Sequence, residues 1–261
     1  MTQHALPPSL TAEQHGPVAV LRLHRPAKRN AIDNPMVAAI GAFFDDLPPG
    51  TRAVVIDGDG DHFSAGLDLS TVTETDTTAG IHHSRLWHRA FDRIANGEVP
   101  VIAVLHGAVV GGGLELACAA HIRVAEESAF YALPEGSRGI YVGGGASVRL
   151  PRLIGVHRMM DMMLTGRTYG AAEGLALGFS QYLVPPGAGR AKAMALAARI
   201  AENTPLTNFA LIQALPRIAD AAPETGLLME SLMAAIAQGD TEAKTRLRDF
   251  LEKRGPKVVH G

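Results

Sequence analysis

The chain has 261 residues, enough to bury a sizeable core, and its 24 Lys and Arg against 26 Asp and Glu give a formal charge of −2. That near-balance provides no electrostatic basis for binding nucleic acid or an anionic membrane surface. The single cysteine, Cys118, cannot form an intramolecular disulfide, and no Cys/His cluster has metal-ligand spacing, so no metal site is predicted.

Strands and helices alternate through the first two thirds of the chain. After a loose lead-in at 1–15, short apolar runs predict strands at 18–23, 53–56, 101–105, 121–125 and 129–132. Helices are predicted at 34–47, with Asn34 as N-cap and Pro35 as first residue, at 82–94, from 146, and at 156–164. This alternation predicts an α/β fold whose sheet is built from βαβ units with right-handed crossovers.

The region after residue 187 contains helical periodicity and no strand candidate. Helices are predicted at 188–203, 207–219, 225–238 and 241–254. The chain therefore divides into a mixed core at 1–186 and an α-helical region at 187–261.

No segment of the chain resembles a targeting or membrane-spanning sequence. Residues 1–13 lack a basic start followed by an apolar run, and the longest apolar runs are far shorter than a membrane span. These features predict a cytoplasmic protein. The three histidines of the 82–94 helix, His82, His83 and His88, are interpreted as surface or packing residues, because no carboxylate completes a metal-ligand spacing.

Three successive glycines, Gly111, Gly112 and Gly113, separate an apolar run from a helix-like stretch that has Glu115 in its first turn. Backbone without side chains can be approached closely, and the first N–H groups of a helix have no intrahelical partner. The pattern is typical of a site where backbone N–H groups stabilise an oxyanion, with the Glu115 carboxylate nearby. A simple strand-to-helix turn remains an alternative, whereas the spaced glycine pattern of a dinucleotide site is absent.

Three stretches occur together in one order: HFSAGLDL at 62–69, HGAVVGGGLELA at 106–117 and FYALPE at 130–135. In this combination the chain resembles the crotonase (enoyl-CoA hydratase/isomerase) superfamily over nearly its whole length. The resemblance implies a crotonase-like spiral of ββα turns at 1–186 that carries the acyl-CoA site. It further implies that the helical region at 187–261 forms a homo-trimer, commonly paired into a hexamer as a dimer of trimers.

The resemblance also implies an acyl-CoA thioester whose carbonyl oxygen is held by the backbone N–H groups of Leu67 and Gly112. Hydratases of the family carry two glutamates, which correspond here to Glu115 and to Glu135, 20 residues later. Adding water to a C=C bond needs one group that takes a proton from water and one that protonates the α-carbon. Glu115 is similar to the water-activating base and Glu135 to the acid, which favours an enoyl-CoA hydratase.

The expected CoA and substrate contacts are also carried over from the family. Lys28, Arg29 and Ala31 resemble the loop near the adenosine, and Lys253 with Arg254 resembles the C-terminal residues that reach CoA phosphates. A solvated turn is an equal alternative for Lys28 and Arg29. No metal, flavin or nicotinamide is implied. The strip beside the ligand is expected to contain Ala65, Gly66, Leu67, Asp68, Leu69 and Gly111.

The segment after Glu135 departs from the family pattern. Val142 stands where many hydratases have proline, and it is preceded by an unusual Tyr141. These residues are expected to lie near the acyl group, so a polar or aromatic acyl group is an alternative to a straight fatty chain. Isomerisation, or hydration followed by retro-aldol cleavage of an aromatic acyl-CoA, and a non-catalytic acyl-CoA-binding subunit remain alternative functions.

Overall fold

The computed structural model describes residues 6–71 and 76–252, and Lys253 and Arg254 lie outside this part of the chain. A six-stranded sheet has the order β1-β2-β3-β4-β6-β9, parallel except for the β1–β2 hairpin. A second sheet has the order β5-β7-β8. The strands of the large sheet are β1 (Leu10–His15), β2 (Val18–Leu23), β3 (Ala53–Gly58), β4 (Val101–Leu105), β6 (Ile122–Glu126) and β9 (Tyr182–Val184), and those of the small sheet are β5 (Ala108–Val110), β7 (Phe130–Ala132) and β8 (Tyr169–Gly170).

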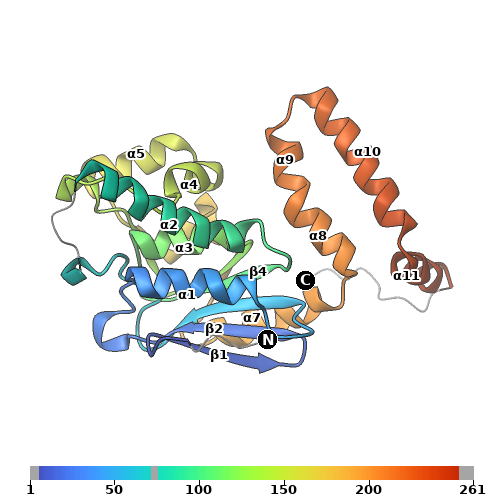
Figure 1. Ribbon diagram of the computed structural model, residues 1–261, viewed down its shortest axis with the longest axis horizontal. Helices are drawn as coiled ribbons and strands as arrows, with labels where there is room; N and C mark the ends of the chain where they lie inside the picture. The colour runs from blue at the N-terminus through green and yellow to red at the C-terminus, as the bar shows by residue number, and fades with distance from the viewer. Residues whose placement is uncertain (1–5, 72–75, 253–261) are drawn as a thin grey trace.

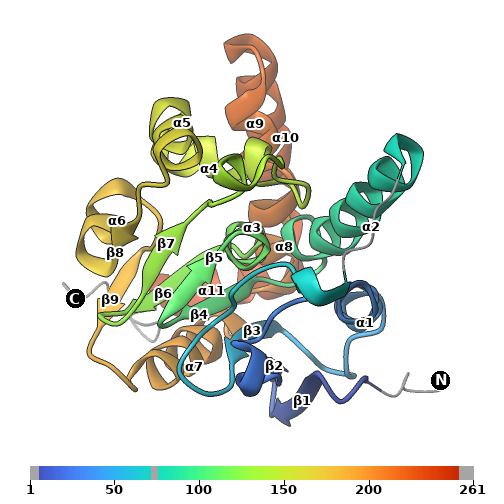
Figure 2. The same cartoon turned by 90° about the vertical axis from the view of Figure 1, so that its left-hand side faces the viewer.

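Successive strands enter the two sheets in turn, which produces the ββα spiral. β4 joins the large sheet, β5 joins the small one, and α3 (Gly112–Ala119) follows, before β6 and β7 repeat the pattern (Figure 2). The remaining core helices are α1 (Asn34–Asp45), α2 (Thr77–Ala95), α4 (Ala146–Ile154), α5 (Val156–Thr165) and α6 (Ala171–Leu177). The mixed α/β architecture with a crotonase-like spiral is thus confirmed.

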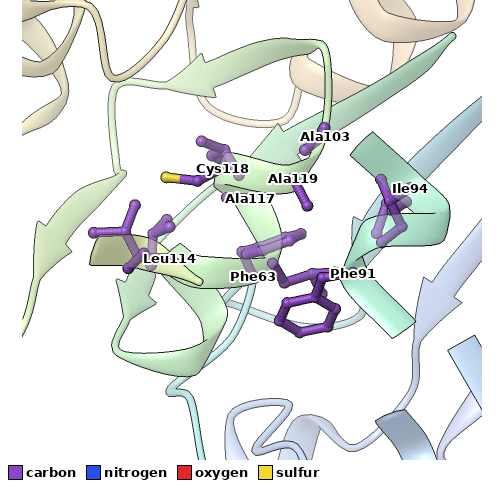
Figure 3. Close-up of a cluster of buried hydrophobic side chains, with 14 of the residues drawn as sticks. Phe63, Phe91, Ile94, Ala103, Leu114, Ala117, Cys118 and Ala119 are labelled. Atoms are coloured by element: carbon purple, nitrogen blue, oxygen red, sulfur yellow. The ribbon is translucent and has the colours of Figure 1, made fainter. Parts of the chain in front are cut away.

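The large sheet is covered on both faces, because its strands alternate between two apolar clusters. On β2, Ala19 and Leu21 enter the main core, whereas Val18 and Val20 pack toward α7 (Gly189–Ala201) on the opposite face. In the main core, one end of α3 meets α2 and strand β4 (Figure 3). The side chains at this meeting point include Phe63, Phe91, Ile94, Ala103, Leu114, Ala117, Cys118 and Ala119.

The last four helices stand away from the two sheets (Figure 1). They are α8 (Pro205–Gln213), α9 (Leu215–Asp220), α10 (Pro223–Gly239) and α11 (Thr241–Leu251). The helix before them, α7, was predicted as part of the same helical region but buries Ala193 and Ala197 against the large sheet. The projecting part therefore begins after α7.

Several predicted element boundaries were wrong. The lead-in contains edge strand β1, whose outer residues are mostly exposed and therefore show no apolar alternation. The N-cap of α1 is Asp33, which accepts from the Met36 N–H at 3.0 Å, and not Asn34. The predicted helix at 207–219 is two helices, α8 and α9, with Pro216 in the first turn of the second. Short elements β5, β8, β9 and α6 were not predicted.

The described residues contain neither a group of metal-binding side chains nor a membrane-spanning helix. No three His, Cys, Asp or Glu side chains within residues 6–71 and 76–252 are grouped so as to hold a metal ion. Over the same residues, no helix has the length and apolar character needed to cross a membrane.

Candidate active site

One cavity of about 1060 Å³ lies among α2, α3 and the segment that leads into α4. Figure 2 shows α3 at the centre of these elements. Of the predicted site residues, the cavity is lined by Ala65, Leu67, Leu69, Gly111, Gly112, Glu115, Glu135 and Tyr141. The sequence therefore brings together, in one cavity, both glutamates and both residues expected to supply backbone N–H groups.

The backbone N–H groups of Leu67 and Gly112 lie side by side at this cavity. Ile32 and Leu67 form a parallel bridge. The Ile32 N–H donates to the Gly66 carbonyl and the Ile32 carbonyl accepts from the Asp68 N–H, each at 2.8 Å. Because Gly66 and Asp68 make these bonds, the N–H of Leu67 points away from Ile32. Gly112 is the first residue of α3, where an N–H has no intrahelical acceptor. A Cβ built on Gly112 would lie 3.4 Å from the Leu67 nitrogen, which shows how closely the two segments approach.

Ser64 holds the Leu67 segment beside the start of α3. Its backbone forms a parallel bridge with Val109, and its hydroxyl donates to the Asn30 carbonyl at 2.8 Å while accepting from the Gly66 N–H at 3.1 Å. No role was predicted for Ser64 from the sequence. Its buried hydroxyl fixes the turn that presents the Leu67 N–H.

The three successive glycines are required for different reasons. Gly111 has φ +53°, a conformation that side chains rarely adopt, and a Cβ there would lie 2.6 Å from Oε1 of Glu135. A Cβ on Gly112 would lie 2.7 Å from the Trp87 ring, and one on Gly113 would lie 2.7 Å from Ser64. The sequence predicted that other groups approach this glycine backbone closely, and in the structure Trp87 and Ser64 pack against it from two sides.

Glu115 is a buried carboxylate held at the start of α4. Its side chain extends from α3, is 4% exposed, and accepts at Oε1 from the backbone N–H groups of Gly144 at 2.8 Å and Ala146 at 3.0 Å. Burial raises the pKa of Glu115, while the backbone donors of residues 143–146 act in the opposite direction. These donors and the helix N-terminus stabilise the ionised form.

Glu135 faces the same cavity, and the backbone donor that acts on its carboxyl group is its own N–H. It precedes the short 3-10 helix Gly136–Arg138, is 8% exposed, and its Oε2 has no hydrogen-bond partner among the described residues. Burial, together with the nearby charge of Glu115, raises the pKa of Glu135 to about 7. The two carboxyl groups thus share a cavity and differ in how strongly their ionised forms are stabilised.

Helix α2 supplies cavity residues that the sequence analysis missed. Trp87 lies against Gly112, and its indole N–H donates to the Asn34 side chain at 3.2 Å. The His83 ring lies 5.8 Å from the Trp87 ring, and burial lowers the pKa of His83. His82 and His83 line the cavity and are not merely surface residues. The one-turn spacing of His83, Trp87 and Phe91 was the available signal for an inward face.

Asp68, Gly66 and the loop at 28–31 do not line the cavity, although they were predicted as substrate contacts. The buried Asp68 carboxylate accepts a hydrogen bond from the Ser70 hydroxyl at 2.6 Å and binds Lys28 at 3.0 Å and Arg25 at 2.9 Å. These three partners, Ser70 above all, hold the pKa of Asp68 well below its usual range. This cluster ties the loop that contains Lys28, Arg29 and Ala31 to the segment around Gly66. Tyr141 lies at the cavity with 70% of its surface exposed.

Comparisons with known proteins agree with this arrangement. The family model described as enoyl-CoA hydratase/isomerase matches residues 13–259. A crystal structure from Rhodopseudomonas palustris CGA009, described as a candidate enoyl-CoA hydratase, is 62% identical with a TM-score of 0.93, over 97% of this chain and 98% of that one. A Bacillus subtilis strain 168 protein named "Probable enoyl-CoA hydratase" is 36% identical over 95% of this chain and 96% of its own length.

A third relative carries a more specific name. The "Short-chain-enoyl-CoA hydratase" of Clostridium acetobutylicum is 30% identical over 93% of this chain and 94% of its own length. The family match spans nearly the whole chain and includes the cavity described above. The chain belongs to the enoyl-CoA hydratase/isomerase family.

Proposed function

We propose that the protein is an enoyl-CoA hydratase, which adds water reversibly and syn across the double bond of a 2-enoyl-CoA to give a 3-hydroxyacyl-CoA. The observation that carries this proposal is the placement of Glu115 and Glu135 in one cavity beside the N–H groups of Leu67 and Gly112. Family membership implies an acyl-CoA substrate.

In the proposed reaction, the thioester carbonyl oxygen lies between the Leu67 and Gly112 N–H groups. Addition of water at the β-carbon places negative charge on that oxygen, as in an enolate. Fixed donors aimed at a developing oxyanion stabilise the transition state by roughly 3 to 4 kcal/mol each. The two amides approach each other closely enough to act on one oxygen atom.

The two carboxyl groups then divide the proton transfers. Glu115, whose ionised form receives backbone hydrogen bonds, takes a proton from water as its oxygen bonds to the β-carbon. Glu135, whose pKa is raised to about 7, holds a proton near neutral pH and gives it to the α-carbon. The C=C π bond, one O–H bond of water and the O–H bond of Glu135 break, while a C–O bond, a C–H bond and an O–H bond on Glu115 form. Proton exchange with solvent then returns both carboxyl groups to their starting protonation states.

The basic residues beside the cavity suit the phosphates of CoA. Lys28 and Arg29 lie on the loop that Asp68 ties to the cavity wall, and Ala65 and Leu69 line the cavity next to it. We include Lys253 in this proposal on the resemblance alone.

We also propose a homo-trimer, or a hexamer made of two trimers, assembled through the projecting helices. These helices expose large apolar side chains, among them Phe209, Leu211, Leu215, Leu227, Leu228, Leu232 and Ile236. Light scattering of the purified protein at micromolar concentration is expected to give three or six times the chain mass. A stable monomer would contradict this assembly.

The reaction is tested by following the loss of enoyl absorbance with crotonyl-CoA and identifying the product by mass. The expected product is 3-hydroxybutyryl-CoA, and Glu115→Gln and Glu135→Gln are each expected to lower kcat by about a hundredfold or more. Absence of turnover of any 2-enoyl-CoA by well-folded protein would refute the proposal. Tight acyl-CoA binding by calorimetry without turnover would instead support a non-catalytic binding subunit.

A second candidate is hydration followed by retro-aldol cleavage of an aromatic acyl-CoA. The observation that favours it is the set of rings at the cavity, His83, Trp87 and Tyr141. Cinnamoyl-type thioesters distinguish the two reactions, because cleavage releases an aldehyde and acetyl-CoA whereas hydration leaves one 3-hydroxyacyl-CoA. A shifted double bond without added water would indicate isomerisation.

A further inference from the structure

The position of the Glu115 carboxylate depends on one glycine-rich loop. Gly144 and Ala146 supply the two N–H groups that bind Oε1 of Glu115. A Cβ on Gly144 would lie 2.9 Å from Oε2 of Glu115, so there is no room for a side chain between this loop and the second oxygen. Any displacement of this loop therefore displaces the donors that orient Glu115.

Arg149 binds this loop, residues 143–146, on the side away from Glu115. This side chain comes from α4, and its Nη1 donates to the Gly144 carbonyl at 3.1 Å. The same nitrogen occupies the space that a side chain on Gly145 would need, and Gly145 has φ +105°. Helix α2 approaches the loop from the other side: a Cβ on Gly143 would lie 2.8 Å from Oγ of Ser84, and the His88 ring interacts with the Gly143 backbone. The loop is thus fastened between two helices.

Arg149 lies outside the cavity lining yet acts electrostatically on Glu115. Desolvation lowers the pKa of Arg149, while the nearby carboxylates of Asp92 and Glu115 act in the opposite direction. An arginine remains ionised near neutral pH under these conditions. Its positive charge in turn lowers the pKa of Glu115. The other charged or titratable groups that interact with Arg149 are Cys118, Arg152 and, from α2, His88.

We propose that Arg149 is a positioning residue for Glu115, which it orients by holding Gly144 so that both loop N–H groups point at Oε1. This inference rests on the proposed hydratase function. Arg149 is not among the residues that line the cavity, so its effect on the reaction passes through the loop. A displacement of about 1 Å in a reacting group is enough to cost on the order of a hundredfold in rate.

The test compares Arg149→Ala with Arg152→Ala, a matched control three residues along α4. Arg152 points to Asp220 at 2.9 Å on the surface and does not contact the loop. Arg149→Ala is expected to lower kcat for crotonyl-CoA by about tenfold to a hundredfold with KM within about twofold, and millimolar guanidinium chloride is expected to restore part of the loss. Arg152→Ala is expected to keep the wild-type kcat. Equal kcat values for the wild type and Arg149→Ala would overturn the proposal.

A double variant separates positioning from general stability. If Arg149 acts through Glu115, Arg149→Ala adds little to the loss already caused by Glu115→Gln. Multiplicative losses would show that Arg149 acts elsewhere and would overturn the proposal. Should Arg149→Ala fail to fold, Arg149→Lys keeps the charge but not the fork of donors, and the same cycle with Glu115→Gln applies.

A readout without turnover distinguishes failure of this inference from failure of the proposed function. Carbon-13 NMR of the glutamate carboxyl groups, assigned with Glu115→Gln, gives the pKa of Glu115 directly. Arg149→Ala is expected to raise that pKa, because it removes a cation and loosens the loop donors, whereas Arg152→Ala is expected to leave it unchanged. A wild type without hydratase activity refutes the function, and an unchanged Glu115 pKa in Arg149→Ala refutes the positioning role.

Discussion

Two buried glutamates, Glu115 and Glu126, are bound at helix starts on opposite sides of the molecule. Glu126 accepts at Oε1 from the Gly189 N–H at 3.0 Å and at Oε2 from the Gly187 N–H at 2.8 Å, where α7 begins. Glu115 also accepts from two N–H groups where α4 begins, but both of these short bonds fall on Oε1.

The difference separates a structural carboxylate from a chemically available one. Each oxygen of Glu126 accepts one backbone N–H of the turn that leads into α7. Val104 of the large sheet lies beside the same turn, next to Gly189. Glu115 lines the cavity, and Oε2 takes neither of its two short bonds. The same local motif therefore stabilises the fold in one place and, in our proposal, orients a base in the other.

The largest expected effect comes from exchanging the Glu115 carboxylate for an amide. Glu115→Gln is expected to lower kcat by about a hundredfold or more with little change in Tm, because the amide oxygen still accepts at the Oε1 position. Hydration of crotonyl-CoA and thermal denaturation measure the two effects. If Glu126→Gln lowered kcat as strongly as Glu115→Gln, the distinction between the two sites would be wrong.

The glycines beside the two carboxylates provide a second, smaller contrast. A Cβ on Gly144 would lie 2.9 Å from Oε2 of Glu115, whereas one on Gly189 would lie 2.6 Å from Val104 and 2.8 Å from Oε1 of Glu126. Gly144→Ala is therefore expected to lower kcat by about tenfold, since it moves a reacting group. Gly189→Ala is expected to lower Tm at unchanged kcat, and the reverse pattern would contradict the assignment.

The stability of the fold is expected to respond to Glu126→Gln. The amide keeps one acceptor and turns a donor toward a backbone N–H, which costs about 1 to 3 kcal/mol of the free energy of unfolding. In a chain of this size each kcal/mol lowers Tm by about 2 to 4 °C. Urea denaturation measures the loss, and Glu127→Gln on the neighbouring exposed residue is the control. An unchanged midpoint would show that the two hydrogen bonds contribute nothing.

The smallest effect concerns Glu135 and depends on pH. In the folded protein its pKa is about 7 rather than the ordinary 4.5, so the unfolded chain releases this proton first and stability falls as the pH rises from about 4.5 through about 7. The whole shift corresponds to about 3 kcal/mol, and partial solvation of the carboxyl group reduces this penalty. Glu135→Gln removes the penalty and is therefore expected to stabilise the protein by about 1 to 2 kcal/mol at pH 8, with no gain from this source at pH 4. A gain that is equal at both pH values would refute the raised pKa.

The sequence was most informative where the chemistry is local. The glycines at 111–113, Glu115 in the following turn and Glu135 after Pro134 were all identifiable, because each belongs to a short motif. The alternating strands and helices likewise predicted the α/β core. Side chains that act across long sequence separations were missed, such as Trp87 against Gly112 and Ser64 beside Asn30.

The role of Glu126 illustrates why these contacts escaped prediction. Its partners Gly187 and Gly189 lie about 60 residues away and meet it only because α7 covers the outer face of the large sheet. Asp68 was similarly expected beside the ligand, but Arg25 and Lys28 reach its carboxylate. Charged side chains at such positions take whichever partner the tertiary fold provides, and a motif alone does not specify that partner.

The parallel bridges Ile32–Leu67 and Ser64–Val109 link three segments that are far apart along the chain. A thioester analogue that accepts hydrogen bonds from the N–H groups of both Leu67 and Gly112 would add a further link between these segments. Unfolding must then release the ligand, so saturating analogue should protect the loops at 24–34 and 59–69 from proteolysis and hydrogen exchange as its concentration rises.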